Sequence, residues 1–238
     1  TDLRELQSAF ARLARVVQAF GRFVPTPVVR NIVLGNEGAN RLHVSRREVT
    51  IMFSDIKGFT SIAEELAPGD LLFVLTRYLT VMTEVVERYG GVVGEIIGDG
   101  MLAFWNTPDD VAHHATKACL AALEQQEVLK ELNREFATEG LPELSIRIGL
   151  HTGRVLSGNL GTETKMKFGC LGDAVNLAGR LEELCKDYGV GILCSGATRL
   201  QLRGIACTEL GRISVAGKAE PMPVCQVVGR AAGLPPGP

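Results

Sequence analysis

The chain has 238 residues, of which 46% are hydrophobic and 22% charged, and its formal net charge is -2. These values fit one sizeable domain with tails, and the absence of a basic excess excludes a general nucleic-acid binder. Six cysteines form no C-x-x-C pair, which favours buried free thiols in a reducing compartment. No apolar run is long enough to cross a bilayer, so a cytoplasmic location is expected.

Apolar residues recur at steps of three and four along the first twenty positions. They are Leu3, Leu6, Phe10, Leu13, Val17 and Phe20. One interpretation is a short parallel coiled coil, which would give a dimer and relay a signal from an upstream regulatory domain in a longer, possibly membrane-attached protein. The other is an amphipathic helix packed on its own domain. Both stay open for residues 1–20.

The remaining pattern predicts one domain over residues 47–229, preceded by an irregular connection at 21–46 and followed by a disordered tail at 230–238. Strands are expected at 48–56, at 91–105 (as a hairpin), at 144–161 (running into a Gly-rich turn), at 165–172, at 189–195 and within 205–229. Helices are expected at 58–90 with a break at Pro68-Gly69, at 109–136, at 173–188 and near 196–202. This order indicates an α+β domain with a mainly antiparallel sheet and flanking helices.

Two aspartates stand where strands are expected to end. Asp55 follows the apolar run "VTIMF", and Asp99 lies at the tip of the hairpin "IIGDGM". Taken singly, each is better explained as a helix cap or a turn residue. If the first strand pairs with the hairpin, however, the two carboxylates meet at one end of the sheet and repel unless cations bridge them. Such oxygen ligands suit Mg²⁺ or Mn²⁺.

Five segments resemble the signatures of class III adenylyl and guanylyl cyclases. They are "FSDIKGFT", "IGDGMLAFW", "IRIGLHTGRVLSGNLG", "LGDAVNLAGRLE" and "GKAEPMPVCQV". The resemblance runs from about residue 47 to 228 and is very specific because all five occur in order. It implies a ferredoxin-like βαββαβ core, head-to-tail homodimers with composite active sites, and closure of a nucleoside triphosphate into a 3′,5′-cyclic monophosphate.

The resemblance also implies roles for individual residues. Asp55 and Asp99 would bind two metal ions, Mg²⁺ or Mn²⁺, with help from the Ile56 carbonyl. Nucleotide contacts are implied for Gly58, Phe59 and Thr60 (triphosphate amides), Arg147 and Lys218 (phosphates), and Asn176 and Arg180 (ribose and transition state). For the last pair the spacing agrees, because residues four apart on a helix share a face. A guanidinium there suits charge growing on the α-phosphate.

These roles predict a two-metal mechanism. One ion would activate the ribose 3′-hydroxyl toward the α-phosphorus, and the second would hold the triphosphate and help pyrophosphate leave. One subunit would contribute Asp55, Asp99 and Arg147, and the other Glu95, Asn176, Arg180 and Lys218. A two-fold interface then makes two equal sites, and a monomer should be nearly inactive. His151 is interpreted as a structural residue.

The residue at position 95 predicts which nucleotide base, guanine or adenine, the site accepts. Adenylyl cyclases of this family usually have a lysine there, which can donate to adenine N1, whereas this chain has Glu95. A carboxylate only accepts hydrogen bonds, and guanine offers N1–H and an exocyclic amine. The second specificity position is Gly169, which has no side chain, although its amide could reach guanine O6. Cys170 would point to the other face unless a bulge at Gly169 turned it round.

The expected function is therefore a guanylyl cyclase acting on GTP, with an adenylyl cyclase acting on ATP as the alternative. A catalytically inactive nucleotide-binding or dimerisation module is a second alternative, disfavoured because every metal and transition-state residue is present. A diguanylate cyclase is disfavoured because "IGDGM" lacks that family's Gly-Gly-acidic-Glu-Phe hairpin. A polymerase or nuclease is disfavoured by the neutral-to-acidic composition.

Overall fold

The computed structural model describes residues 2–21, 23–36, 41–214 and 220–231. Strands and helices alternate in an α+β arrangement, as the sequence predicts. The strands are β1 (His43–Ile56), β2 (Val92–Ile97), β3 (Gly100–Trp105), β4 (Ile146–Gly161), β5 (Met166–Leu171), β6 (Ile192–Ser195), β7 (Ile205–Ile213) and β8 (Met222–Arg230). The helices are α1 (Asp2–Phe20), α2 (Thr26–Val33), α3 (Phe59–Glu65), α4 (Pro68–Arg88), α5 (His114–Thr138), α6 (Asp173–Tyr188) and α7 (Gly196–Arg199).

The sheet is mainly antiparallel and has the order β2-β3-β1-β4-β6-β8-β7, with β5 paired to β4. The run β2-β3-β1-β4 is the strand order of a ferredoxin-like βαββαβ unit, so the predicted core is confirmed. Within the described strands only β4 and β6 run parallel. β1 and β4 pair along all of β1, from His43↔Asn159 to Ile56↔Ile146. This long pair forms the central axis of the domain.

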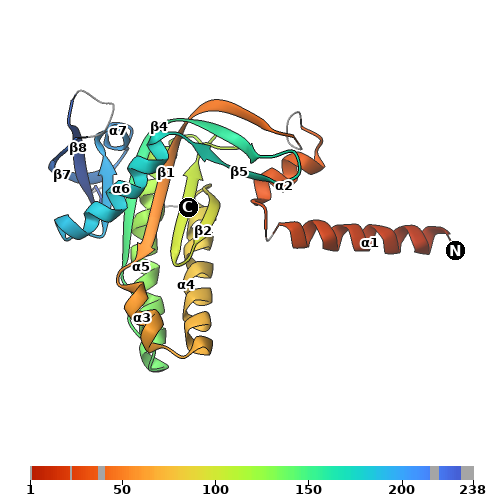
Figure 1. The fold of residues 1–238 in the computed structure, drawn as a ribbon, viewed down its shortest axis with the longest axis horizontal. Coiled ribbons are helices and arrows are strands. Elements are labelled where there is room, and N and C mark those ends of the chain that lie inside the picture. Colours follow the sequence, from red (N-terminus) through yellow and green to blue (C-terminus); the bar gives the residue numbers. More distant parts are fainter. Residues whose placement is uncertain (1, 22, 37–40, 215–219, 232–238) are drawn as a thin grey trace.

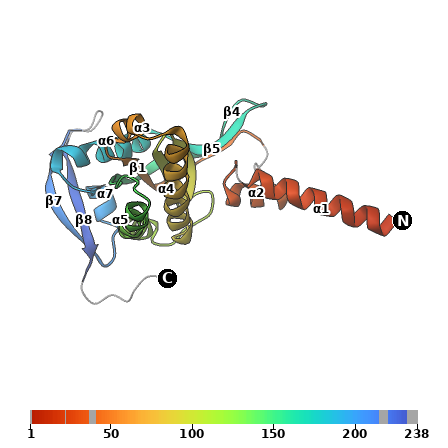
Figure 2. The ribbon, with the colours of Figure 1, turned by 90° about the horizontal axis from the view of Figure 1, so that it is seen from below.

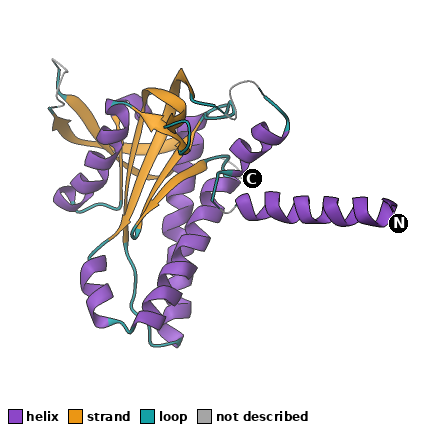
Figure 3. Cartoon of the chain, turned by 45° about the vertical axis from the view of Figure 1, so that its right-hand side comes forward, coloured by secondary structure: helices purple, strands orange, loops and turns teal. Residues whose placement is uncertain are grey.

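Helices cover both faces of the sheet (Figures 1 and 3). Side chains alternate along a strand, so Met52 packs with α4 and α5 in the largest core cluster. Ile51 packs instead with Ala174 and Ala178 of α6 on the opposite face. The predicted thiols are free, and Cys119, Cys185, Cys194 and Cys225 are buried. The two faces thus have separate cores, and among the described helices α6 is the one that packs against β1 on its side of the sheet.

Four elements differ from the sequence prediction, and one of them is α5, which begins at His114 rather than at 109. The connection at 21–46 contains α2, because Pro27 lies in its first turn, where proline's missing N–H costs nothing. β1 begins at His43 rather than at 48. The expected Gly-rich turn is instead a continuation of β4 to Gly161. Gly158 there has φ 150°, and a Cβ would overlap the His43 carbonyl, so glycine lets the two strands stay paired.

The helix α1 projects away from the domain (Figures 1 and 2). Its apolar seam is open to solvent: Leu3 is 69% exposed, Leu6 55%, Phe10 67% and Leu13 60%. Packing of this helix on its own domain, one of the two interpretations, is therefore not what the structure has. The seam is free to meet another chain.

Candidate active site

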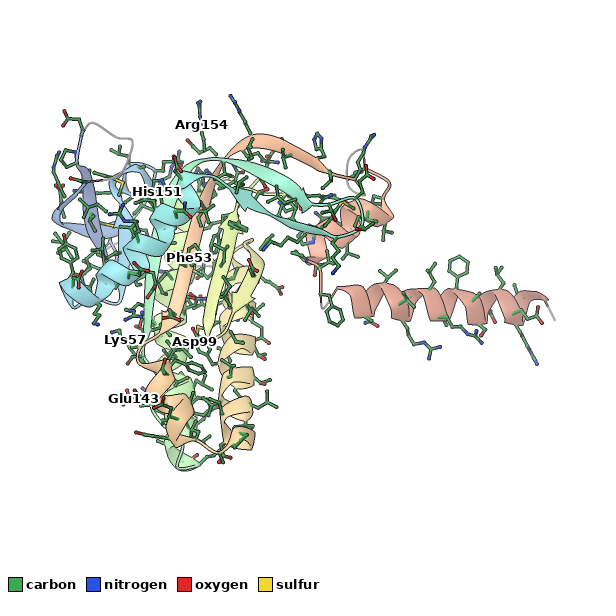
Figure 4. The ribbon with its side chains drawn as sticks, in the orientation of Figure 1. Phe53, Lys57, Asp99, Glu143, His151 and Arg154 are labelled. Carbon is green, nitrogen blue, oxygen red and sulfur yellow. The ribbon has the colours of Figure 1, made fainter. Side chains whose placement is uncertain are left out.

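The two predicted metal carboxylates meet at one end of the sheet. Asp55 occupies the penultimate position of β1, and Asp99 lies in the β2–β3 turn after Gly98, which has φ 64°. The Ile56 amide donates to Asp99 Oδ2 at 3.1 Å, which ties the turn to the end of β1. Figure 4 places Asp99 and Lys57 together at this end of the sheet. The predicted convergence of Asp55 and Asp99 is thus present.

The proximity of these carboxylates has an electrostatic cost. Burial, followed by the neighbouring Asp55 carboxylate, raises the pKa of Asp99 to about 6. A carboxylic acid whose pKa is raised by burial and by a neighbouring like charge is stabilised in its ionised form when a cation binds beside it. The oxygen donors fit a hard divalent cation such as Mg²⁺ or Mn²⁺. Within the described residues no group of three or more His, Cys, Asp or Glu could hold a metal, so an ion here would rely on these two carboxylates, backbone oxygens such as that of Ile56, and the substrate.

Arg147 lies directly opposite Asp55 in the β1–β4 register. Its Nη2 donates to Asp55 Oδ2 at 3.1 Å, and its Nε donates to Glu182 Oε1 of α6 at 2.7 Å. Burial lowers the pKa of Arg147, but Glu182 and Asp55 more than reverse this and leave it raised. The predicted phosphate ligand is therefore, in this chain, the cation that balances Asp55. Glu182 was not among the predicted site residues.

The segment proposed to wrap the triphosphate joins β1 to α3. Gly58 precedes the helix with φ 68°, a left-handed conformation that glycine adopts freely. Its carbonyl accepts from the amides of Ser61 and Ile62, which starts the helix. The first amides of a helix lack intrahelical acceptors, so those of Phe59 and Thr60 have no acceptor within α3. Their contact with phosphate stays a prediction.

Glu95, which is predicted to read the base, lies next to a bulge in β2. The pairing of β2 with β3 shifts register between Val93 and Glu95, and a Cβ on the intervening Gly94 would overlap the Phe104 ring. A bulge re-aims the side chains beside it. The Glu95 carboxylate accepts from Lys167 Nζ of β5 at 2.7 Å. Lys167 was not among the predicted site residues.

Gly169 lies two residues beyond Lys167 in β5, opposite Gly158 of β4. The pairing runs without a shift from Leu156↔Leu171 to Gly161↔Met166, so the bulge considered for Gly169 is absent. Cys170 consequently faces the other side, where it packs against the core cluster of β1, β3 and α6. Burial raises the pKa of the Cys170 thiol to about 11. This cysteine is a core residue rather than a base reader.

Asn176 and Arg180 lie one turn apart on α6, and both are exposed. Arg180 Nη2 donates to the Ser214 carbonyl at 3.4 Å and makes no ion pair with Glu182, which Arg147 occupies. His151 is buried, with Nδ1 2.7 Å from Ser195 Oγ, consistent with a structural residue. The remaining predicted site residue, Lys218, lies outside the described residues, as does most of the predicted tail.

Comparison with known proteins gives the family. The model for the adenylate and guanylate cyclase catalytic domain matches residues 43–227. Adenylate cyclase 1 of Rhizobium meliloti is 34% identical over 229 residues, which is 96% of this chain and 34% of that protein. The solved guanylyl cyclase Cya2 has a TM-score of 0.73 and 32% identity, covering 81% of this chain and 97% of its own. The chain therefore belongs to the class III nucleotidyl cyclase catalytic domains and is a cyclic-nucleotide-forming lyase domain.

A third relative extends the likeness to the N-terminal helix. The structure of a bacterial light-regulated adenylyl cyclase has a TM-score of 0.83 and 26% identity, covering 98% of this chain and 67% of its own. The relatives thus include both adenylyl and guanylyl cyclases, and this chain spans about a third of the Rhizobium protein. Across the described residues, none of the helices combines the length and apolarity that crossing a bilayer requires.

Proposed function

We propose that this domain is a guanylyl cyclase that converts GTP into 3′,5′-cyclic GMP and pyrophosphate at composite sites of a homodimer. The choice of guanine as the base rests on the presence of a glutamate, Glu95, at the position predicted to contact it. An ionised carboxylate accepts the N1–H and exocyclic amine of guanine, whereas adenine presents a bare N1 lone pair at the same edge. A pocket built around a hydrogen bond discriminates strongly against a base that leaves it unmade.

The groups around the phosphates are supplied by this chain. Asp55, Asp99 and the Ile56 carbonyl would hold two divalent ions, and Arg147 would turn from Asp55 to the phosphates. When bound, the ions supply Lewis acidity and neutralise charge on the triphosphate. The 3′-hydroxyl releases its proton to water as its oxygen forms a bond to the α-phosphorus, and the bond from that phosphorus to pyrophosphate breaks.

The remaining machinery acts on the nucleotide's α-phosphate and sugar. Asn176 orients the ribose, Arg180 stabilises charge on the α-phosphate, and Lys218 holds the triphosphate. Removal of a donor such as Arg180 costs about two to three orders of magnitude in rate.

A cavity beside β2 supports a site completed by a second subunit. Its volume is about 980 Å³, and Glu95 lines it but neither Asp55 nor Asp99 does. Asn176 and Arg180 are likewise exposed rather than gathered around the carboxylates. Two copies arranged head to tail would bring the base-reading and transition-state groups of one chain to the metal carboxylates of the other.

We also infer that α1 pairs with its counterpart in the second copy and joins the catalytic domain to an upstream regulatory domain. The open seam of Leu3, Leu6, Phe10 and Leu13 supports a coiled coil, since these residues recur at a/d spacing. The likeness to the light-regulated adenylyl cyclase, which covers 98% of this chain, supports the link to a regulator.

The test is product formation by purified dimer with Mn²⁺ and either GTP or ATP. We expect cyclic GMP to exceed cyclic AMP by at least an order of magnitude. Glu95→Lys should lower kcat/KM for GTP by about 100-fold or more, because it replaces the acceptor with a donor. Glu139→Lys, the same charge change at the exposed C-terminal end of α5, is the matched control and should leave both activities unchanged.

Two other outcomes would each select an alternative. Dominant cyclic AMP would make this an adenylyl cyclase, the function named for the Rhizobium relative, and would refute the role given to Glu95. No product from either nucleotide, in a sample shown to be dimeric, would leave an inactive nucleotide-binding module.

A further inference from the structure

Four of the six cysteines gather in one part of the core. Cys119 of α5, Cys194 of β6 and Cys225 of β8 are fully buried in the largest core cluster. Cys207 of β7 is partly buried and packs against the same cluster. The strands β8 and β7 form the edge of the sheet farthest from α1 (Figure 1). The mechanism proposed for the nucleotide uses none of these thiols.

The four thiols are not arranged around a metal ion. A structural zinc site needs about four ligands at the corners of a tetrahedron. Within the described residues, no three His, Cys, Asp or Glu side chains are placed to share an ion. Each of the cysteines is a free thiol. The chemistry that remains open to neighbouring thiols is oxidation to a disulfide.

The strand register brings one pair of these thiols within reach of a disulfide. Cys194 lies directly opposite Cys225 in the antiparallel pairing of β6 with β8. Opposite residues of an antiparallel pair have Cα atoms about 4.5–5.5 Å apart, and a disulfide requires about 4.4–6.8 Å. Both side chains pack in the same core cluster and so lie on the same face of the sheet. The two sulfurs can therefore be joined with little movement of either strand.

Cys207 gives an oxidant access to this pair. It is partly exposed, whereas Cys194 and Cys225 have no exposed surface. The Cys194 thiol donates a hydrogen bond to the Cys207 sulfur, and this bond, together with the nearby Arg199 guanidinium, lowers the pKa of Cys207 despite its partial burial. The thiolate is the form of cysteine that reacts as a nucleophile. Cys207 is therefore the most accessible and the most reactive sulfur of the cluster.

Arg199 also reaches the opposite pair. Its Nη1 donates to Cys225 Sγ at 3.7 Å and to Glu209 Oε2 at 3.1 Å. Burial raises the pKa of Cys225, and Arg199 offsets this in part. A guanidinium at this place stabilises the thiolate that Cys225 must become before it can attack a disulfide. The cluster thus combines an accessible nucleophile, Cys207, with a second sulfur that a cation assists.

We propose that this cluster is a peroxide-sensitive modification site, in which Cys207 is oxidised first and a disulfide then forms between Cys194 and Cys225. The Cys207 thiolate attacks one oxygen of a hydroperoxide such as hydrogen peroxide. The S–O bond forms as the O–O bond breaks, and the oxygen that leaves takes up a proton from solvent. The Cys194 sulfur then attacks the Cys207 sulfenic acid, the S–O bond breaks, and hydroxide leaves with the Cys194 proton as water.

A final exchange moves the disulfide to the pair that the register favours. β8 separates β6 from β7 in the sheet, so a bond between Cys194 and Cys207 would draw two non-adjacent strands together. Cys225 gives its proton to solvent and attacks the Cys194 sulfur, the bond to Cys207 breaks, and Cys207 leaves as the thiolate. Over the three steps two thiols lose two electrons, and hydrogen peroxide is reduced to two molecules of water.

The experiment treats the reduced, purified protein with hydrogen peroxide, blocks the remaining thiols and maps disulfides by mass spectrometry of the unreduced peptides. We expect the loss of two of the six thiols of each chain, and a linked pair of peptides that contain Cys194 and Cys225. Dithiothreitol should restore all the thiols. Cys207→Ala should slow the reaction at least about tenfold, because the remaining thiols of the cluster are buried and protonated.

Two further variants test the order of the steps. Cys225→Ala should block the final exchange, so that the linked peptides contain Cys194 and Cys207 instead. Cys185→Ala is the matched control, because it removes a buried thiol outside the cluster, whose Sγ donates to the Ile148 carbonyl at 3.4 Å. It should form the Cys194–Cys225 disulfide at the wild-type rate. Thermal melting of each reduced variant checks that it is folded, and the disulfide map of the wild type needs no substitution.

Retention of all the thiols, under conditions that oxidise a free cysteine, would overturn the proposal. So would a disulfide that includes Cys170 or Cys185, a sulfinic acid at Cys207 with no disulfide, or a Cys207→Ala variant that oxidises as fast as the wild type. A stable link between Cys194 and Cys207 in the wild type would overturn the exchange step. No nucleotide is present in these reactions, so their outcome is independent of the proposed guanylyl cyclase function.

Discussion

Arg147 is held by carboxylates from two different elements, Asp55 of β1 and Glu182 of α6. Burial raises the pKa of Glu182, and Arg147 counteracts this only in part. The arginine is thus a resident counter-ion at the site where two metal ions are proposed to bind. Arrival of those ions would take over the neutralisation of Asp55 and free Nη2 of Arg147 for a phosphate, while Nε stays on Glu182.

The sequence predicted the residues whose spacing alone defines a motif. Asp55 and Asp99 belong to recognisable segments and converge as expected, and Glu95 lies two residues before the second of these segments. Glu182 and Lys167 were missed because their ion pairs depend on which strands and helices meet across the sheet. The period of two in a strand places Lys167 on the face of Gly169, and this was the one signal in the sequence that could have found it.

Acidification should destabilise the protein through His114. This side chain lies 2.8 Å from Thr50 Oγ1, and burial lowers the pKa of His114 despite an opposing effect of Glu48. A histidine with a lowered folded-state pKa binds fewer protons folded than unfolded, so stability rises with pH across that window. The stability that His114 contributes in its neutral form is fully present above the pKa of a histidine in the unfolded chain, near 6.5. It is lost as the pH falls through the lower pKa of His114 in the folded protein.

The measurement is urea unfolding at pH 7 and at pH 5. His114→Gln should lose less stability than the wild type between the two, whatever its stability at pH 7. His43→Gln, which changes an exposed histidine at the start of β1, should follow the wild type. If His114→Gln lost as much stability as the wild type, the contribution assigned to this histidine would be wrong.

At the scale of elements, α6 lies against the backbone of β4 at Gly149. A Cβ there would overlap the Ala178 carbonyl and the Glu182 amide, one turn of α6. Gly149→Ala should therefore push the helix outward and cost about 1–3 kcal/mol of unfolding free energy, as overpacking does. Because α6 carries Asn176 and Arg180, kcat should fall by about 10- to 100-fold as well.

Gly229→Ala is the matched control, since a Cβ on this β8 glycine meets nothing within 4 Å among the described residues. It should alter neither denaturant midpoint nor kcat. If the Gly149→Ala enzyme had wild-type stability, α6 would be able to move away from β4 without cost. The close approach of α6 to Gly149 would then contribute nothing to the free energy of unfolding.

Elements with strong local signals were predicted well, and those set by pairing were not. The break between α3 and α4 follows from Pro68, and the β2–β3 turn from Gly98. The extension of β1 back to His43 and of β4 on to Gly161 depends on the two strands pairing with each other. That partnership cannot be read from either segment alone, and a Gly-rich stretch such as 158–161 looks like a turn until its partner is known.

At the scale of the whole molecule, α1 predicts a concentration-dependent dimer. Phe10→Glu puts a charge into the middle of the seam, which should raise the dimer dissociation constant at least about tenfold and lower specific activity at low protein concentration. Analytical ultracentrifugation and a dilution series of activity measure the two effects. Ser8→Glu, on the opposite face of the helix, is the control.

Equal dissociation constants for the Phe10→Glu and Ser8→Glu variants would show that α1 takes no part in the interface. Dimerisation would then rest on the catalytic domain alone, and the exposed seam would need another partner.

The close packing of α6 against the backbone of β4 has a further consequence in a head-to-tail dimer. In the proposed dimer, Arg147 of β4 would belong to one composite site, and Asn176 and Arg180 of α6 would belong to the other. Gly149 joins the two elements by backbone contact, and the Arg147–Glu182 pair joins them again. If the proposed dimer forms, a substrate that shifts β4 at one site would displace α6 at the other. We then expect the two sites to communicate, and velocity to depart from a simple hyperbola as the concentration of the proposed substrate GTP is raised.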